Sequence, residues 1–250
     1  MRPRIAIPVP HSGNRGYVDR ALPQYERAVK RAGGDPVPIP LDRTPADVMK
    51  LIERCDAVLL PGSGADVDPA KYDAPRHPKT ADPDKKRDTV DELLLQDAYN
   101  MRKPIFGICY GLQMLNVYRT GSLVQHIESA INHEAGRKVP VAHTVIVEPD
   151  SKLAKIVRET GANLAHMPVN SSHHQSAQVA GDGLRIVSRC ADDGVAEAIE
   201  GTAPGHFVLA VQWHPERSVD SDEPSRALFK AFVEAARAKH DELVGEFENS

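Results

Sequence analysis

Cys109 is the residue whose surroundings indicate chemistry most clearly. It stands in Gly107-Ile108-Cys109-Tyr110-Gly111, after an apolar run and before residues compatible with a helix. This order of strand, sharp turn and helix is the nucleophile elbow that many hydrolases build around a serine. The turn is strained, which favours glycine on both sides of the nucleophile. Because the N-terminus of a helix favours a thiolate, the pattern predicts a nucleophilic cysteine of lowered pKa instead of a buried structural one.

A second candidate group follows the strand expected at residues 207–211. There the chain reads Gln212-Trp213-His214-Pro215-Glu216. Pro215 cannot continue a strand, so His214 and Glu216 are expected on one side of a short turn, where the carboxylate can hold the imidazole. Taken alone, His214 fits a strand-end histidine beside a solvated glutamate equally well. Joined to Cys109, it completes the nucleophile, base and orienting carboxylate of an activated thiol.

A glycine-rich loop follows the strand expected at residues 57–60. In Gly62-Ser63-Gly64, backbone N–H groups are left bare and could form half of an oxyanion hole. The N–H of Tyr110, directly after the nucleophile, would supply the other half. A dinucleotide-binding fingerprint begins similarly, but its third glycine is missing and Asp68-Pro69 stands where its helix should begin. A plain strand-to-loop turn is the remaining alternative.

Together these motifs resemble the class I glutamine amidotransferase superfamily, and within it the γ-glutamyl-γ-aminobutyrate hydrolase branch, peptidase family C26. The resemblance runs from Pro8 to about Ser218. The string Asn170-Ser171-Ser172-His173-His174-Gln175 is the part that indicates the branch. Further matching motifs are Arg87-Asp88 with Glu92, Asn116-Val117, and Asp193-Gly194 with Glu197-Ala198.

The resemblance implies a role for each matching residue. Cys109 would be the nucleophile, His214 the base and Glu216 its partner. Backbone groups would bind the oxyanion, and a set of polar side chains would hold the α-amino and α-carboxylate groups of the glutamyl moiety. The oxyanion set is Gly62, Ser63, Gly64 and Tyr110, and the substrate set is Gln113, Ser172, His173, His174 and Gln175. No cofactor and no metal are expected.

Three positions depart from the pattern of the branch. Tyr110 stands where arginine is frequent, Thr120-Gly121 replaces a glycine pair, and Ser63 replaces a glycine. None of them belongs to the expected triad. The first could change what the pocket accepts beyond the glutamyl group.

Composition and length fit a soluble enzyme. The 250 residues are 41% apolar and show no repeat or linker, which predicts a single domain over residues 1–250 with a sizeable core. A net charge of −4 gives no nucleic-acid footprint, and no apolar run approaches the ~20 residues of a membrane span. The start of the chain lacks a signal sequence, and three scattered cysteines suit a reducing cytoplasm. The expected partner is a small γ-glutamyl substrate, with a homodimer left open.

The pattern of elements predicts an α/β fold with a mainly parallel, doubly wound, flavodoxin-like sheet and a β-rich second half. Ligands of such sheets bind at the carboxyl ends of the strands. The expected strands are 5–9, 37–39, 57–60, 105–108, 142–147, 184–188, 196–199 and 207–211, and the expected helices are 17–32, 45–54, 88–101, 110–118 and 227–247.

The histidines raise a zinc alternative. His173 and His174 are adjacent, and His143, His166, His206 and His214 are further candidates. Adjacent residues in an extended segment point to opposite faces, so the pair is not expected to share one ion. Because no HExxH or CxxC motif supports a metal, the pair is instead assigned to the substrate pocket.

The resemblance predicts a hydrolase that releases glutamate from a γ-glutamyl amide through a thioester. Two alternatives are a glutaminase subunit that supplies ammonia to a separate synthetase, and a catalytically silent binding protein on this fold. The loop 71–87 carries six Lys or Arg against three Asp. Because such a loop borders the pocket, an anionic leaving group such as γ-aminobutyrate is expected, although a solvated loop without a role fits the charges equally well.

Overall fold

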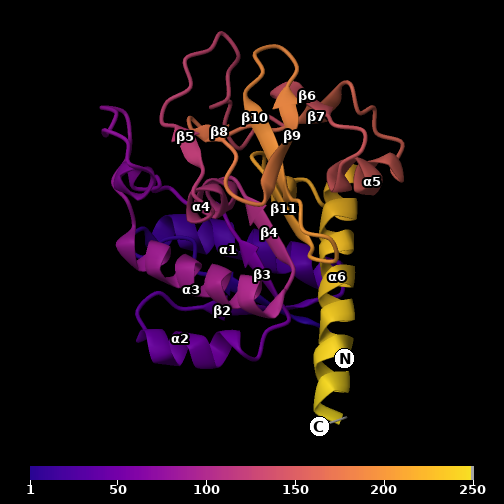
Figure 1. The fold of residues 1–250 in the computed structure, drawn as a ribbon. Helices are drawn as coiled ribbons and strands as arrows, with labels where there is room; N and C mark the ends of the chain where they lie inside the picture. Colours follow the sequence, from indigo (N-terminus) through magenta and orange to yellow (C-terminus); the bar gives the residue numbers. More distant parts are fainter. Residues whose placement is uncertain (249–250) are drawn as a thin grey trace.

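A computed structural model describes residues 1–248 of the chain (Figure 1). The first half alternates strands and helices as the sequence predicts. Its elements are β1 (Arg4–Pro8), α1 (Arg15–Arg31), β2 (Asp35–Ile39), α2 (Pro45–Ile52), β3 (Ala57–Leu60), α3 (Lys85–Met101), β4 (Ile105–Ile108) and α4 (Tyr110–Tyr118).

The second half is richer in strands, as expected, and ends in one long helix. It contains β5 (Ser122–Val124), β6 (His143–Val147), α5 (Lys152–Arg158), β7 (Met167–Val169), β8 (Ser176–Val179), β9 (Leu184–Cys190), β10 (Ala196–Gly201), β11 (Val208–Val211) and α6 (Glu223–Glu248). Short 3₁₀ turns lie at Pro69–Tyr72 and Pro215–Arg217.

Nine strands form one mixed sheet in the order β2-β1-β3-β4-β11-β10-β9-β6-β7. Neighbours from β2 through β11 pair in parallel, whereas each pair from β11 to β7 is antiparallel. β5 and β8 form a separate antiparallel pair. The predicted α/β class is confirmed.

Helices cover both faces of the sheet, because alternate strand residues point to opposite sides. Ile5 and Ile7 belong to one core cluster with side chains of α1, α5 and α6, while Ala6 belongs to a second cluster with side chains of α2, α3 and α4. The long α6 runs along one side of the fold, and its last turns project beyond the sheet in Figure 1. Within residues 1–248, no helix combines the length and apolar character needed to cross a membrane.

The topology brings three loops to one edge of the sheet. β3, β4 and β11 are parallel neighbours, and they end just before Pro61, Cys109 and Gln212. Chain segments about 50 and 100 residues apart therefore meet at the carboxyl ends of the strands, where ligands of such sheets bind.

Candidate active site

Cys109 occupies the turn between β4 and α4 in a backbone conformation that residues other than glycine rarely adopt. Its φ is 54° and its ψ is −105°. The residues two positions before and two positions after Cys109 must be glycine for steric reasons. A Cβ on Gly111 would lie 2.1 Å from the carbonyl oxygen of Leu60, and one on Gly107 would lie 2.9 Å from Ala210 Cβ. Strain of this kind persists only where the surroundings enforce it, and it is frequent at active sites.

The histidine and its carboxylate follow β11, the strand that pairs with the strand before the cysteine. Cys109 N–H donates a hydrogen bond of 2.8 Å to the carbonyl of Val211. Beyond that strand, the Nδ1 atom of His214 lies 2.8 Å from Glu216 Oε1. Both side chains are buried, and His214 Nε2 has no hydrogen-bond partner within the described chain. Because Nδ1–H donates to the carboxylate, Nε2 carries a lone pair that can accept a proton.

Asn170 fixes the backbone of His214, a role that was not predicted from the sequence. Its side-chain oxygen accepts a 2.9 Å hydrogen bond from the His214 N–H, and its Nδ2 donates one of 2.9 Å to the His214 carbonyl. The Asn170 side chain thus binds both the backbone N–H and the backbone carbonyl of His214. Its place at the head of the Asn-Ser-x-His-His-Gln string was the available signal.

The pKa of Cys109 differs from the sequence-based expectation of a lowered value. Burial raises it to about 12, and this outweighs the lowering by Arg217 and by the Tyr110 N–H. Burial also lowers the pKa of His214. Burial acts against the charge of Glu216 too, but His214 and Arg217 lower its pKa overall. The resting pair is therefore a thiol and a neutral imidazole, with an ionised carboxylate behind the ring.

The glycine-rich loop presents only some of the expected oxyanion donors. Gly62 N–H already donates a 3.0 Å hydrogen bond to the Tyr25 hydroxyl, which nothing in the sequence indicated. The N–H groups of Ser63 and Gly64 have no such partner within the described residues. In the resting structure these two groups and the Tyr110 N–H remain as candidate donors.

Arg87 anchors the glycine-rich loop through hydrogen bonds to the backbone. The side chain is fully buried, and its Nη2 donates 2.7 Å to the carbonyl of Pro61, just before Gly62. Nη1 donates 2.9 Å to Pro10, Nε binds Asp91 at 2.7 Å, and the guanidinium lies over the Tyr110 ring. The sequence shows the motif around Arg87, but only the structure shows that the side chain anchors this loop.

The side chains expected to bind substrate already contact other protein groups in the structure. Gln113 Nε2 faces the carbonyl of Gln175 at 3.3 Å and Gln212 Oε1 at 3.4 Å, and Ser172 accepts a 2.8 Å hydrogen bond from Arg217. The two adjacent histidines diverge as predicted.

His174 pairs with Asp66, at 3.0 Å between Nε2 and Oδ2. His173 instead directs Nδ1 to the carbonyl of Gln175 and Nε2 toward Glu197. Because both of its ring nitrogens face protein groups, His173 is not placed to bind the glutamyl group directly.

The charge of the loop 71–87 is neutralised in part, because three of its six cations pair with carboxylates. Lys71 pairs with Glu92 and Asp88, Arg76 with Asp82, and Arg87 with Asp91. Lys79 is exposed, and its Nζ lies 2.9 Å from His126 Nε2. The His126 ring in turn lies beside the ring of His174. It is the cation of this loop that is best placed near the expected substrate segment.

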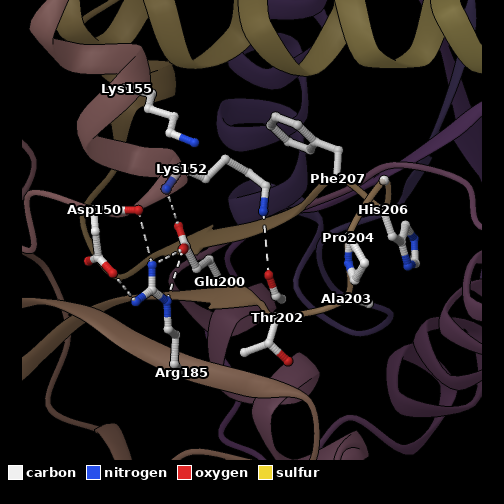
Figure 2. A pocket seen from close by; sticks show the side chains of 12 residues that line it. Asp150, Lys152, Lys155, Arg185, Glu200, Thr202, Ala203, Pro204, His206 and Phe207 are labelled. Carbon is white, nitrogen blue, oxygen red and sulfur yellow. Dashed lines mark hydrogen bonds and ion pairs between the residues drawn. The ribbon is translucent and has the colours of Figure 1, made fainter.

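A wide pocket of about 640 Å³ lies elsewhere, between α5 and the ends of β9 and β10 (Figure 2). In Figure 2, Arg185 contacts both carboxylates of the pocket, Asp150 and Glu200. Its wall includes Gly205–Phe207, which precede β11, whereas His214 follows β11. The pocket is thus at the opposite end of that strand from the candidate site.

Comparison with known proteins defines the class. The fold matches that of a "putative gmp synthase subunit a protein" from Thermoplasma acidophilum, with a TM-score of 0.67 at 15% identity over 97% of this chain and 98% of that one. This likeness and the elbow define a class I glutamine amidotransferase-like fold. Residues 10–216 match the family Peptidase C26, and the chain belongs to this family.

Two relatives illustrate the range of the family. The chain is 32% identical to the γ-glutamyl-γ-aminobutyrate hydrolase PuuD of Escherichia coli K12, over 94% of each chain. It is 38% identical to a "putative glutamine amidotransferase" of Mycobacterium tuberculosis, over 85% of this chain and 66% of the relative.

Proposed function

We propose that the protein is a cysteine-dependent hydrolase that cleaves a γ-glutamyl amide and releases glutamate through a glutamyl thioester. The observation that carries this proposal is the strained elbow of Cys109 beside a strand whose His214 is held by Glu216. Membership of the peptidase C26 family supports a hydrolase. The 32% identity to a γ-glutamyl-γ-aminobutyrate hydrolase supports the substrate class.

The protonation states suggest how the first step runs. Because the resting thiol is protonated, its proton moves to His214 Nε2 as sulfur attacks the γ-carbonyl carbon. Glu216 stabilises the imidazolium that forms. Tyr110 N–H, with Ser63 or Gly64, would bind the oxyanion, and each such donor is typically worth roughly 3–4 kcal/mol.

The imidazolium then protonates the leaving amine, and the carbon–nitrogen bond breaks to leave the thioester. In the second half of the reaction, the same imidazole takes a proton from water, which attacks the thioester and frees glutamate and the thiol. Gln113, Ser172, His174 and Gln175 are proposed to hold the α-groups of the glutamyl moiety.

A glutaminase subunit that supplies ammonia to a separate synthetase is the second candidate. The 38% identity to a "putative glutamine amidotransferase" of Mycobacterium tuberculosis favours it. The two functions share their chemistry and differ in the leaving group and in the need for a partner.

The test is glutamate release from γ-glutamyl-γ-aminobutyrate, γ-glutamyl-putrescine, glutamine and a glutaryl amide, with Cys109→Ala as the control. Release from a γ-glutamyl amide by the isolated chain, abolished in Cys109→Ala, supports the proposal. Turnover of glutamine only when a synthetase is added would support the second candidate. Equal cleavage of the glutaryl amide would contradict a pocket built for the α-amino group, and no release from any substrate would support a silent binding protein.

A further inference from the structure

Three histidines and one glutamate form a buried cluster one strand away from the catalytic edge. His133 comes from the segment after β5, His143 begins β6, His173 precedes β8, and Glu197 lies in β10. The exposed fractions of these residues lie between 0% and 6%. One ring nitrogen of each histidine faces Glu197 Oε1, at 3.3 Å for His133, 3.3 Å for His143 and 3.5 Å for His173.

The second ring nitrogen of each histidine faces an acceptor outside the cluster. His133 Nε2 lies 2.8 Å from Asp193 Oδ2, His173 Nδ1 lies 3.0 Å from the carbonyl of Gln175, and His143 Nδ1 lies 3.5 Å from that of Thr144. Carbonyl and carboxylate oxygens only accept hydrogen bonds, so the outer nitrogen of each ring carries the proton. In a neutral ring, the nitrogen that faces Glu197 then presents a lone pair.

Three lone pairs and a carboxylate therefore face one another without a donor between them. The three inner nitrogens and both oxygens of Glu197 lack a hydrogen-bond partner within the described chain. Buried polar atoms are normally satisfied, and an unpaired buried charge is costly. A cation at the centre would satisfy the whole set at once.

The spacing fits a metal ion better than shared protons. Zinc bonds of 2.0–2.1 Å to nitrogen and oxygen, arranged as a tetrahedron, place neighbouring ligand atoms about 3.3 Å apart. The distances to Glu197 have this length, and all four ligand atoms lie within 4.8 Å of one another. Charge-assisted hydrogen bonds between imidazolium and carboxylate would be shorter, at about 2.7–2.9 Å.

We propose that His133, His143, His173 and Glu197 bind a divalent transition metal ion, with Zn²⁺ as the first choice. Imidazole ligands suit zinc, and four buried protein ligands without an open position are typical of a structural site. The outer acceptors match the groups that orient metal-bound histidines in known sites.

The ion would join four segments that are far apart in sequence. One of them leads directly into His174 and Gln175, and the backbone carbonyl of Glu197 accepts a 2.7 Å hydrogen bond from Gln212 N–H, two residues before His214. The metal would therefore hold the substrate-binding segment against the strand that carries the catalytic histidine. The sequence does not indicate this site, because its ligands have no short spacing and the adjacent pair His173-His174 supplies only one of them.

The first experiment uses the full chain, expressed in zinc-supplemented medium and dialysed. Metal analysis by mass spectrometry should find about one zinc per chain. Removal by a strong chelator should lower Tm, and Zn²⁺ should restore it, because an ion that binds only the folded state stabilises that state. Co²⁺ added to the metal-free protein should give the visible absorption of a four-coordinate site.

Variants localise the ion. Glu197→Gln and His143→Ala should each lose the bound zinc, and Asp193→Asn should weaken binding by about 10–100-fold. His206→Gln is the matched control, because His206 is equally buried but binds the carbonyl of Lys103, outside the cluster. It should retain the metal.

The proposal is overturned if the wild-type chain is purified without metal and then neither binds Zn²⁺ or Co²⁺ in a saturable 1:1 manner nor changes its Tm. It is also overturned if zinc binds but Glu197→Gln, folded by circular dichroism, keeps the wild-type affinity. The wild-type measurements decide the question even if a variant does not fold.

Discussion

Replacing Arg87 by methionine should lower both the stability and the activity of the protein, because this one side chain serves both. The guanidinium is fully buried and satisfies Asp91 together with the carbonyls of Pro10 and Pro61. Removing one partner of a buried ion pair costs about 3–5 kcal/mol, because the other charge is left unpaired. At roughly 2–4 °C per kcal/mol for a chain of this size, Tm should fall by about 6–20 °C.

A second variant separates the charge from the loop. In Arg87→Met/Asp91→Leu no buried charge is left alone, and replacement of both partners by apolar groups is often neutral. The carbonyls of Pro10 and Pro61 still lose their donor, which leaves a cost of about 1–3 kcal/mol. Stability should therefore recover in part, while kcat/KM should stay low because the loop after Pro61 has lost its anchor.

The assays are urea unfolding and glutamate release, with Arg76→Met as the control. Arg76 pairs with Asp82 at the surface, where such a pair is worth about 0.2–1 kcal/mol. If the double variant recovers activity in parallel with stability, Arg87 acts only through the fold and the anchoring role is wrong. If Arg87→Met unfolds no more easily than Arg76→Met, the reasoning about the buried pair is refuted.

Three further predictions concern the site. Cys109→Ala and His214→Ala should each abolish nearly all turnover with little change in Tm, and the double variant should be hardly worse, since residues acting as one unit are not additive; measurable turnover by His214→Ala near the wild-type rate would refute its role as base. Because burial lowers the pKa of His214, the imidazole stays neutral to lower pH. The acid limb of kcat/KM should therefore have its midpoint below the usual histidine value of about 6.5, and a midpoint above it would contradict the assigned base. Lys79→Ala should reduce any preference for a carboxylate-bearing leaving amine by at most about fivefold, in line with an exposed charge, whereas Lys86→Ala should not change it; equal effects of the two variants would remove Lys79 from the pocket.

The parts of the fold that form a continuous apolar run before a glycine motif, or that show a helical period, could be predicted from the sequence. The bounds of β3, β4 and α4 agree with the expectation, and Thr44 caps α2 as its type and position indicate. β5, β7 and β8 are also short, but none of them is a continuous apolar run that leads into a glycine motif, and three or four residues show no periodicity. The seven-residue α5 was missed for the same reason.

The site shows the same division. Local chemistry, namely the elbow and the turn that holds His214 to Glu216, could be derived because neighbouring residues determine it. The pKa of Cys109 could not, since it depends on how deeply the thiol is buried by distant segments. The charge of the loop 71–87 was overestimated for a related reason, because Glu92 and Asp91, which neutralise it in part, lie beyond the loop.

The place of β11 in the sheet has a consequence for how the protein is made. β11 is the last strand in the sequence, yet it lies between β4 and β10 and joins the parallel half of the sheet to the antiparallel half. Until it emerges from the ribosome, both of those strands present an open edge, the kind of surface through which growing chains aggregate. Cys109 is synthesised 105 residues before His214, so the proposed nucleophile precedes its proposed base by this interval. Closure of the sheet and assembly of the proposed catalytic pair thus both require the last strand to be synthesised.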